Sequence, residues 1–357
     1  MELYQHINFW QRNRKMKMQT LMLSTEEIDK AAQIIREGGL VAMPTETVYG
    51  LAADAYNGKA VANIFRAKGR PMDNPLIVHI ADISQIYGLV REFPEKARIL
   101  ADKFWPGPLT MILPKSERIP DEVSAGLDTV AVRCPSDPYA RKLISLSSPL
   151  AAPSANLSGS PSPTTAHHVF SDMNGRIDAI IDGGECDVGV ESTVITLAVQ
   201  PPRLLRPGGI TLEQLRGAIG EVVLDDAVLN PLKSGERAAS PGMKYKHYAP
   251  QAELTLLKGS EESFLKFVNG MKDGKTAVLC YDEDIPRLEL PFIPLGRAMD
   301  HDVQASRLFS ALREADDKGF KRVYAHCPHT DGVGLAVYNR MIRAAGFKVI
   351  ELDDKTS

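Results

Sequence analysis

The sequence predicts an α/β protein with two domains, a larger one with a mixed sheet and a smaller one with a parallel sheet. Short apolar runs of strand-like composition alternate with amphipathic helical segments along most of the 357 residues. The alternation is irregular before residue 220 and regular after residue 251. Between these parts, residues 225–250 are rich in Pro, Ser, Gly and charge, as expected of a linker.

The first helix is predicted from a capping box, Ser24 with Glu27, and runs to Arg36 before two glycines. The segments that follow in the first domain are strand 40–43, helix 61–67, strand 75–80, helix 94–104, strands 109–113 and 129–133, helix 138–146, strands 150–152, 179–182, 192–197 and 203–205, and helix 212–220. Because these segments do not keep a strict strand–helix order, the sheet is expected to be mixed.

The second domain is predicted to hold strands 252–257, 276–281, 321–325 and 347–352 and helices 261–269, 303–315 and 335–345. Strict alternation of this kind favours a parallel sheet. The sequence GMKDGKT at 270–276 follows a helix and precedes a strand, which is the reverse of the order in a phosphate-binding P-loop. We therefore interpret it as a helix C-cap and turn.

Composition narrows the class of protein. The chain has 42 Lys+Arg and 45 Asp+Glu, a net charge of −3 and 44% hydrophobic residues, which excludes general disorder. This charge argues against a protein covered with nucleic-acid contacts but is compatible with a local basic groove. No run reaches the ~18–20 apolar residues of a membrane helix, so no membrane association is expected. Residues 1–20 lack the features of a secretory signal and are expected to be an unstructured leader.

The four cysteines are far apart and form no CxxC pair. This favours free thiols in a reducing compartment, and so a cytoplasmic protein. His326, Cys327 and His329 match no usual zinc spacing, and we assign them no role.

Polar clusters follow several strands of the first domain, where α/β folds place ligands. They are PTETVYG at 44–50, KGRPMDNPLIVH at 68–79 and APSANLSG at 152–159, with Arg133, Ser192 and Arg206 added. Guanidinium, hydroxyl and amide groups dominate, and paired acids are scarce. This inventory suits a polyanion and a small polar molecule better than hydrolysis.

Each of these residues also has a structural explanation. Lys68 and Arg70 could be a solvated helix end. Ser154 and Asn156 could form turns, His79 could be a half-buried strand residue, and the threonines could cap a helix. From the residues alone we predict a polyanion or nucleotide pocket in the first domain.

The motifs PTETVYGL, AKGRPMDNPLIVHI, AAPSANLSG, GVESTV and LLRPG occur in this order. With SPGMKYKHYAP at 240–250 and DGVGLAVYNRMIRAA at 331–345, they resemble the threonylcarbamoyl-AMP synthase family (YrdC/YwlC type) in its long, two-domain form. The resemblance implies a YrdC-like α/β domain with a twisted mixed sheet at 21–220. It further implies a linker that acts as a lid at 221–250 and a smaller Rossmann-like domain at 251–357.

The resemblance also implies a reaction. Members of this family are nucleotidyltransferases that join L-threonine, bicarbonate or CO2, and ATP into threonylcarbamoyl-AMP and pyrophosphate. A downstream threonylcarbamoyl-transfer complex then modifies tRNA beside the anticodon, and weak contact with tRNA or other double-stranded RNA is compatible with this role. Mg²⁺ is expected to arrive with ATP, because the sequence holds no dedicated carboxylate cage.

The family's functional residues can be carried over to matching positions of this chain. The expected ATP-binding residues are Lys68, Arg70, Asn74, Thr129, Asn156, Thr164, Arg206, Tyr245, His247 and Tyr248. The expected threonine-binding residues are Thr47, His79, Arg133, Ser154 and Ser192. Of these, the resemblance implies catalytic roles for Lys68, Arg70, Ser154 and Asn156, and Tyr245, His247 and Tyr248 would belong to the lid.

Two other functions deserve comparison. A related domain occurs in larger carbamoyl-adenylate-forming enzymes, but those carry CxxC zinc modules that this chain lacks. The first domain also resembles binders of double-stranded RNA, whose affinity would fall steeply with salt. For the C-terminal domain we expect support of the lid or contact with a partner, because its loops hold no convincing catalytic set.

Overall fold

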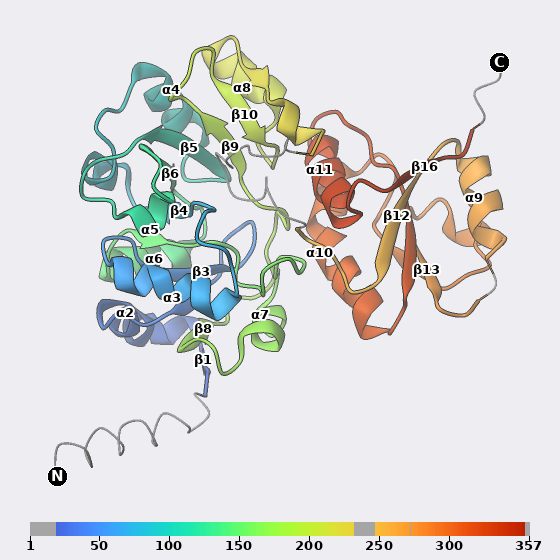
Figure 1. Ribbon diagram of the computed structural model, residues 1–357, viewed down its shortest axis with the longest axis horizontal. Helices are drawn as coiled ribbons and strands as arrows, with labels where there is room; N and C mark the ends of the chain where they lie inside the picture. The colour runs from blue at the N-terminus through green and yellow to red at the C-terminus, as the bar shows by residue number, and fades with distance from the viewer. Residues whose placement is uncertain (1–18, 232–246, 272, 354–357) are drawn as a thin grey trace.

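The computed structural model describes residues 19–231, 247–271 and 273–353. Two sheets form two adjoining lobes, with the C-terminal lobe beside the edge of the first that carries β9 and β10 (Figure 1). Thr20, within the predicted leader, is buried and donates from its hydroxyl to the Ile177 carbonyl (2.7 Å). None of the helices described is long and apolar enough to span a bilayer.

The larger sheet is mixed. Within the described residues it has eleven strands in the order β1-β8-β2-β3-β7-β4-β6-β5-β9-β10-β11. Their bounds are β1 Leu21–Leu23, β2 Val41–Met43, β3 Gly50–Asp54, β4 Ile77–His79, β5 Leu109–Pro114, β6 Thr129–Arg133, β7 Leu150–Ala151, β8 Ala179–Ile181, β9 Thr193–Thr196, β10 Arg203–Arg206 and β11 Val223–Leu224. Strand β6 pairs parallel with β4 and antiparallel with β5, so the predicted mixed sheet is confirmed.

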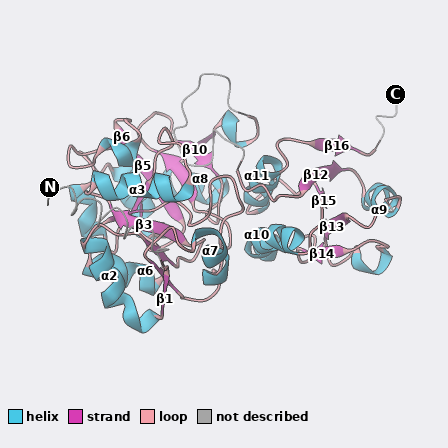
Figure 2. Ribbon diagram, turned by 60° about the horizontal axis from the view of Figure 1, so that its bottom comes forward, coloured by secondary structure: helices cyan, strands magenta, loops and turns pink. Residues whose placement is uncertain are grey.

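Helices cover this sheet and bury its apolar residues (Figure 2). Their bounds are α2 Ile28–Arg36, α3 Gly58–Lys68, α4 Glu95–Phe104, α5 Asp121–Ser124, α6 Pro138–Leu146, α7 Ala166–Met173 and α8 Leu212–Ile219. The predicted capping box at Ser24 precedes a short 3-10 turn before α2, and Glu27 accepts from the Ser24 amide (3.0 Å). A further 3-10 turn, η3, spans Asp226–Val228 after the sheet ends.

The smaller sheet is entirely parallel, in the order β14-β13-β15-β12-β16. Its elements are β12 Glu253–Lys258, α9 Glu261–Asn269, β13 Thr276–Cys280, β14 Phe292–Pro294, α10 His301–Asp317, β15 Arg322–His326, α11 Gly334–Ala344 and β16 Val349–Glu351. Gly270 is the C-cap of α9 and β13 begins at Thr276, which confirms the predicted helix end before a strand. The predicted parallel α/β domain is therefore confirmed.

Several short elements were not predicted from the sequence. Strand β3 is rich in Gly and Ala, which have low strand propensity, and it forms because β2 and β7 pair with it on both sides. Strands β1, β11 and β14 are two or three residues long and give no periodic signal. Helix α7 is capped by Thr165, whose hydroxyl accepts from the His168 amide (3.2 Å).

The topology brings several strand ends to one place. His79 and Arg133 end the parallel neighbours β4 and β6 and lie opposite each other in register. Thr110 of β5 is the antiparallel partner of Arg133. Strand β9 runs parallel to β5 and begins one residue after Ser192. This edge of the sheet therefore gathers the polar ends of four strands.

Candidate functional site

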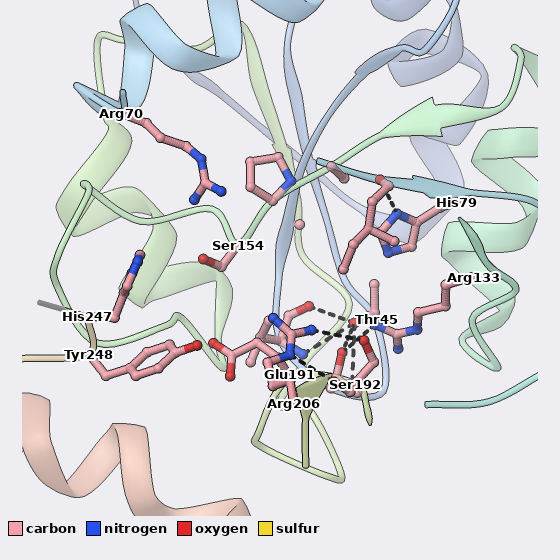
Figure 3. A pocket seen from close by; sticks show the side chains of 16 residues that line it. Thr45, Arg70, His79, Arg133, Ser154, Glu191, Ser192, Arg206, His247 and Tyr248 are labelled. Carbon is pink, nitrogen blue, oxygen red and sulfur yellow. Dashed lines mark hydrogen bonds between the residues drawn. The ribbon is translucent and has the colours of Figure 1, made fainter. Parts of the chain in front are cut away.

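A cavity lies where these strand ends meet the loop between β2 and β3 (Figure 3). It is lined by Thr45, Thr47, Val48, Gly50, Arg70, Ile77, His79, Arg133, Ala152, Pro153, Ser154, Glu191, Ser192, Arg206, His247 and Tyr248. All five residues predicted to bind threonine line it. Of the predicted ATP-binding residues, Arg70, Arg206, His247 and Tyr248 line it as well.

Arg133 is buried at 3% exposure and is already paired. Its Nη2 lies 2.8 Å from Glu46 Oε2, and its Nη1 donates to Thr47 Oγ1 (2.8 Å). Burial raises the pKa of Glu46, but the charge of Arg133 outweighs this and holds that pKa below its ordinary value. The carboxylate is thus ionised and fixes the guanidinium in the cavity wall, while Arg133 Nε has no hydrogen-bond partner among the described residues.

His79 is neutral in the cavity. Burial, assisted by the nearby Arg133 charge, lowers the pKa of His79 to about 3. Its Nδ1 lies 3.2 Å from the Ile77 carbonyl, which can only accept, so Nδ1 carries the proton. The other ring nitrogen, Nε2, is then a hydrogen-bond acceptor.

Ser192 is held from two sides. Arg206 Nε donates to the Ser192 carbonyl (3.0 Å), and Nη2 donates to Ser192 Oγ (3.1 Å). Thr110 Oγ1 lies 2.7 Å from the same hydroxyl. Burial lowers the pKa of Arg206 only to about 10, so the guanidinium remains charged at neutral pH. The hydroxyl of Ser192 is therefore oriented by its own protein partners.

Lys68 ends α3 and reaches the loop that contains Ser154 and Asn156. Its Nζ donates to the carbonyls of Ser154 and Asn156, the second at 2.5 Å. Burial, followed by the charge of Arg70, lowers the pKa of Lys68 well below its ordinary value. Lys68 does not line the cavity in this conformation but shapes the loop that does. Its predicted contact with the triphosphate stays a prediction.

Arg70 and Asn74 flank the same region. Arg70 Nη2 makes two long contacts of 3.4 Å, to the carbonyls of Asn74 and Pro75. The Asn74 side chain is 1% exposed, and neither its Oδ1 nor its Nδ2 has a partner among the described residues. Asn156 donates from Nδ2 to the Ser160 carbonyl (2.9 Å), but its Oδ1 is buried and unpartnered as well. Buried amide atoms without a protein partner are rare, and they are available to a water molecule or a ligand.

Two predicted lid residues, His247 and Tyr248, line the cavity (Figure 3). Tyr248 has a φ of 65°, unusual for a bulky residue, and its ring lies 5.3 Å from that of Phe309 in α10. His247 is held neutral because burial and the nearby Arg70 charge lower its pKa to about 3. The third predicted lid residue, Tyr245, lies outside the described residues.

The structure places two other predicted residues away from the cavity lining. Thr164 is buried, and its Oγ1 lies 3.0 Å from Ser310 Oγ in α10. Thr129 begins β6, at the opposite end of that strand from Arg133. Their roles in ATP binding stay predictions.

Sequence reasoning missed three residues of the site. Glu46 and Glu191 line or support the cavity and pair with buried arginines, and Thr110 contacts Ser192. A signal for the acids was present, because arginines inside apolar strands such as TVAVR require buried counter-ions. Glu46 in PTETVYG and Glu191 in GVEST were the acids available within the motifs. Among the residues described, no group of three or more His, Cys, Asp or Glu is placed to hold a metal ion.

Comparison with known proteins identifies the family to which this chain is similar. A family model described as telomere recombination matches residues 33–208, and one described as threonylcarbamoyl-AMP synthase, C-terminal domain, matches residues 210–346. The threonylcarbamoyl-AMP synthase of Pyrococcus abyssi is 50% identical over 332 residues, which is 90% of this chain and 95% of that protein. The Bacillus subtilis enzyme is 47% identical over 335 residues, 92% of this chain and 96% of that protein.

A solved structure agrees with these relatives. The crystal structure of P. abyssi Sua5 complexed with L-threonine superposes with a TM-score of 0.87 and 47% identity. The match covers 94% of this chain and all of that one. The cavity, the two family matches and the near full-length relatives agree, and the chain belongs to the threonylcarbamoyl-AMP synthase family.

Proposed function

We propose that this enzyme condenses L-threonine, bicarbonate or CO2, and ATP into threonylcarbamoyl-AMP and pyrophosphate. The observation that carries the proposal is the convergence of Thr47, His79, Arg133 and Ser192 in one cavity. The P. abyssi relative, crystallised with L-threonine, supports this reading.

The cavity wall offers matching groups for threonine. The unpartnered Nε of Arg133 would donate to the substrate carboxylate. The acceptor Nε2 of His79 would receive a hydrogen bond from the substrate hydroxyl or amine. Because Glu46 and Ser192 are held by their own partners, these groups need little rearrangement on binding.

The chemistry requires positioning more than a protein nucleophile. The α-ammonium group of threonine is mostly protonated at neutral pH, so a proton must leave before the nitrogen can capture CO2 as a carbamate. A carbamate oxygen then bonds to the α-phosphorus of ATP, the bond from that phosphorus to the bridging oxygen breaks, and pyrophosphate leaves. Holding the reactants in line can supply roughly 7–11 kcal/mol of the barrier.

The groups proposed for ATP include both lining residues of the cavity and buried amides outside its lining. Arg70 and Arg206 supply charge for the phosphates, and Ser154 lies between them (Figure 3). The buried amides of Asn74 and Asn156 would gain their missing partners from the nucleotide. Mg²⁺ would enter as the companion of ATP, held by phosphate oxygens and water.

The wider setting is proposed on the same basis. The product would serve the threonylcarbamoyladenosine modification of tRNA, through a separate transfer complex in the cytoplasm. Weak contact of this protein with tRNA fits that role and would be detected as salt-dependent RNA binding.

The test is pyrophosphate release from ATP by the purified protein in bicarbonate buffer. We expect release only when L-threonine and bicarbonate are both present, with L-serine as the substrate control. Arg70→Ala should lower kcat/KM for ATP at least about tenfold, since it removes a charged phosphate contact. Arg66→Ala, on the exposed side of α3, is the matched control and should change it little. Folded protein without threonine-dependent release would overturn the proposal.

A further inference from the structure

The two domains share one hydrophobic core beside the cavity. Val48 and Val190 come from the first domain and Tyr248 from the segment over the cavity, and all three pack with the apolar residues of the C-terminal domain. A Cβ built on Gly189 would lie 2.4 Å from the Cα of Ser306 in α10. The loop that precedes Ser192 therefore rests directly on the backbone of the second domain (Figure 1).

Arg340 of α11 reaches this loop from the C-terminal domain. It is fully buried, Nε donates to Glu191 Oε2 (2.7 Å), and Nη2 donates to the Glu191 carbonyl (3.1 Å). Its guanidinium carbon lies 5.6 Å from the centre of the Tyr248 ring. Nη1 donates to Asn339 Oδ1 (2.9 Å), and Asn339 in turn donates to the Val228 carbonyl (2.7 Å) of η3. One side chain thus contacts two residues that line the cavity, Glu191 and Tyr248.

Glu191 has a charge that needs this partner. Its side chain lines the cavity and faces Tyr248 (Figure 3), and its other oxygen accepts from Ser162 Oγ. Burial raises the pKa of Glu191, but the charges of Arg340 and then Arg206 outweigh it and hold the pKa below its ordinary value. Without Arg340, the buried Glu191 carboxylate would lose its ion-pair partner. Its negative charge would then face the cavity that is proposed to receive a polyphosphate.

We propose that Arg340 is a positioning residue for the reaction: the C-terminal domain supplies the cation that neutralises Glu191, so that ATP can bind beside it under Tyr248. The inference rests on the proposed function, because it assumes that the anion is ATP. Arg340 does not line the cavity, and it acts through Glu191 and Tyr248. The C-terminal domain is then part of the active site, although it contributes no catalytic residue.

A second ion pair between the domains provides a matched control. Arg313 of α10 donates from Nη1 and Nη2 to the two carboxylate oxygens of Asp172 (3.1 and 2.9 Å). Neither residue lines the cavity. Arg313→Met should therefore lower the melting temperature through weaker domain docking, without a pH-dependent change in the KM for ATP.

The experiment compares Arg340→Met, Glu191→Gln and the double variant in the full chain. Kinetic constants for ATP are measured from pyrophosphate release with saturating threonine, between about pH 6 and about pH 9. In Arg340→Met the pKa of Glu191 rises, so the carboxylate is ionised at high pH and increasingly neutral at low pH. We expect the KM for ATP to rise about tenfold at the alkaline end and less at the acid end. The double variant also lacks the Glu191 carboxylate, so its KM for ATP should return to within about threefold of the wild-type value.

Two results would overturn the inference. One is an equal, pH-independent rise in KM in Arg340→Met and the double variant, which would make Arg340 a simple packing residue. The other is a wild-type KM in Arg340→Met. If Arg340→Met does not fold, Arg340→Lys takes its place, because lysine keeps the charge. A KM for ATP within about threefold of wild type and a flat pH profile would support the inference. A tenfold, pH-independent rise in that KM would contradict it. A wild-type enzyme with no threonine-dependent turnover would instead defeat the proposed function.

Discussion

Gly189 and Gly126 share the same φ angle but have different surroundings, so a comparison of their alanine variants tests the contact between the domains. Both have a φ of +73°, in the left-handed region that side chains rarely adopt. A Cβ on Gly126 would meet nothing within 4 Å, whereas on Gly189 it would lie 2.4 Å from Ser306 Cα and 2.6 Å from the Ser306 carbonyl oxygen. We predict that Gly189→Ala destabilises the protein clearly more than Gly126→Ala.

The expected difference in stability between the two variants follows from a backbone-conformation contribution and a packing contribution. Each alanine costs about 1–2 kcal/mol for its left-handed conformation. Only Gly189→Ala adds overpacking, and the atoms it meets are backbone atoms of α10 that cannot rotate away. Carbon contacts need about 3.5 Å, so the loop and helix must separate by about 1 Å. Overpacking of this kind costs about 1–3 kcal/mol more.

Thermal unfolding of the two variants provides the assay. At roughly 2–4 °C per kcal/mol, Gly189→Ala should melt several degrees below Gly126→Ala. Equal melting temperatures would refute the packing of this loop on α10.

Three further predictions concern the cavity. Glu46→Gln should flatten the acid limb of the stability curve. The pKa of Glu46 is held below its ordinary value of 4.5, so its charge stabilises the fold fully above that value, and this contribution is lost as the pH falls through the folded pKa. The melting temperatures of variant and wild type should therefore converge once the pH is below the folded pKa. Asn74→Leu should leave stability unchanged or raise it by up to about 1 kcal/mol, because it removes unpartnered buried atoms. The same variant should raise the KM for ATP about tenfold. An unchanged KM would show that the nucleotide does not use this amide. His79→Ala should raise the KM for threonine. Because the pKa of His79 is about 3, the wild-type pH profile of kcat/KM for threonine should show no limb near the ordinary histidine pKa of 6.5. A limb at that pH which is lost in the variant would contradict the assignment of His79 as neutral.

The residues of the cavity could be predicted because they sit in short motifs beside recognisable strands. Thr47, His79, Ser192 and Arg206 each follow or precede an apolar run, and polar residues at strand ends gather at one edge of a sheet. The two-domain α/β class followed from the same alternation. These signals are local, so a single sequence carries them.

The pairings inside the site could not be predicted, because they join distant parts of the chain. Arg133 and Thr47 are 86 residues apart, and Arg340 and Glu191 are 149 apart. Lys68 could be recognised as important, but its contact with two backbone carbonyls depends on how the loop at Ser154 is folded. Periodicity and spacing say nothing about such contacts, which the strand order decides.

The arginines of the site differ in the contacts that they make. Arg133 and Arg206 each make contacts of 2.8–3.1 Å to protein partners, so their positions are set before substrate binds. Arg70 Nη2 lies 3.4 Å from the carbonyls of Asn74 and Pro75, and its guanidinium projects into the cavity from the opposite side (Figure 3). A phosphate oxygen is a stronger acceptor than a backbone carbonyl, because it carries charge. Exchange of these two carbonyl contacts for phosphate oxygens would therefore be favourable, whereas movement of Arg133 would leave Glu46 as a buried, uncompensated charge.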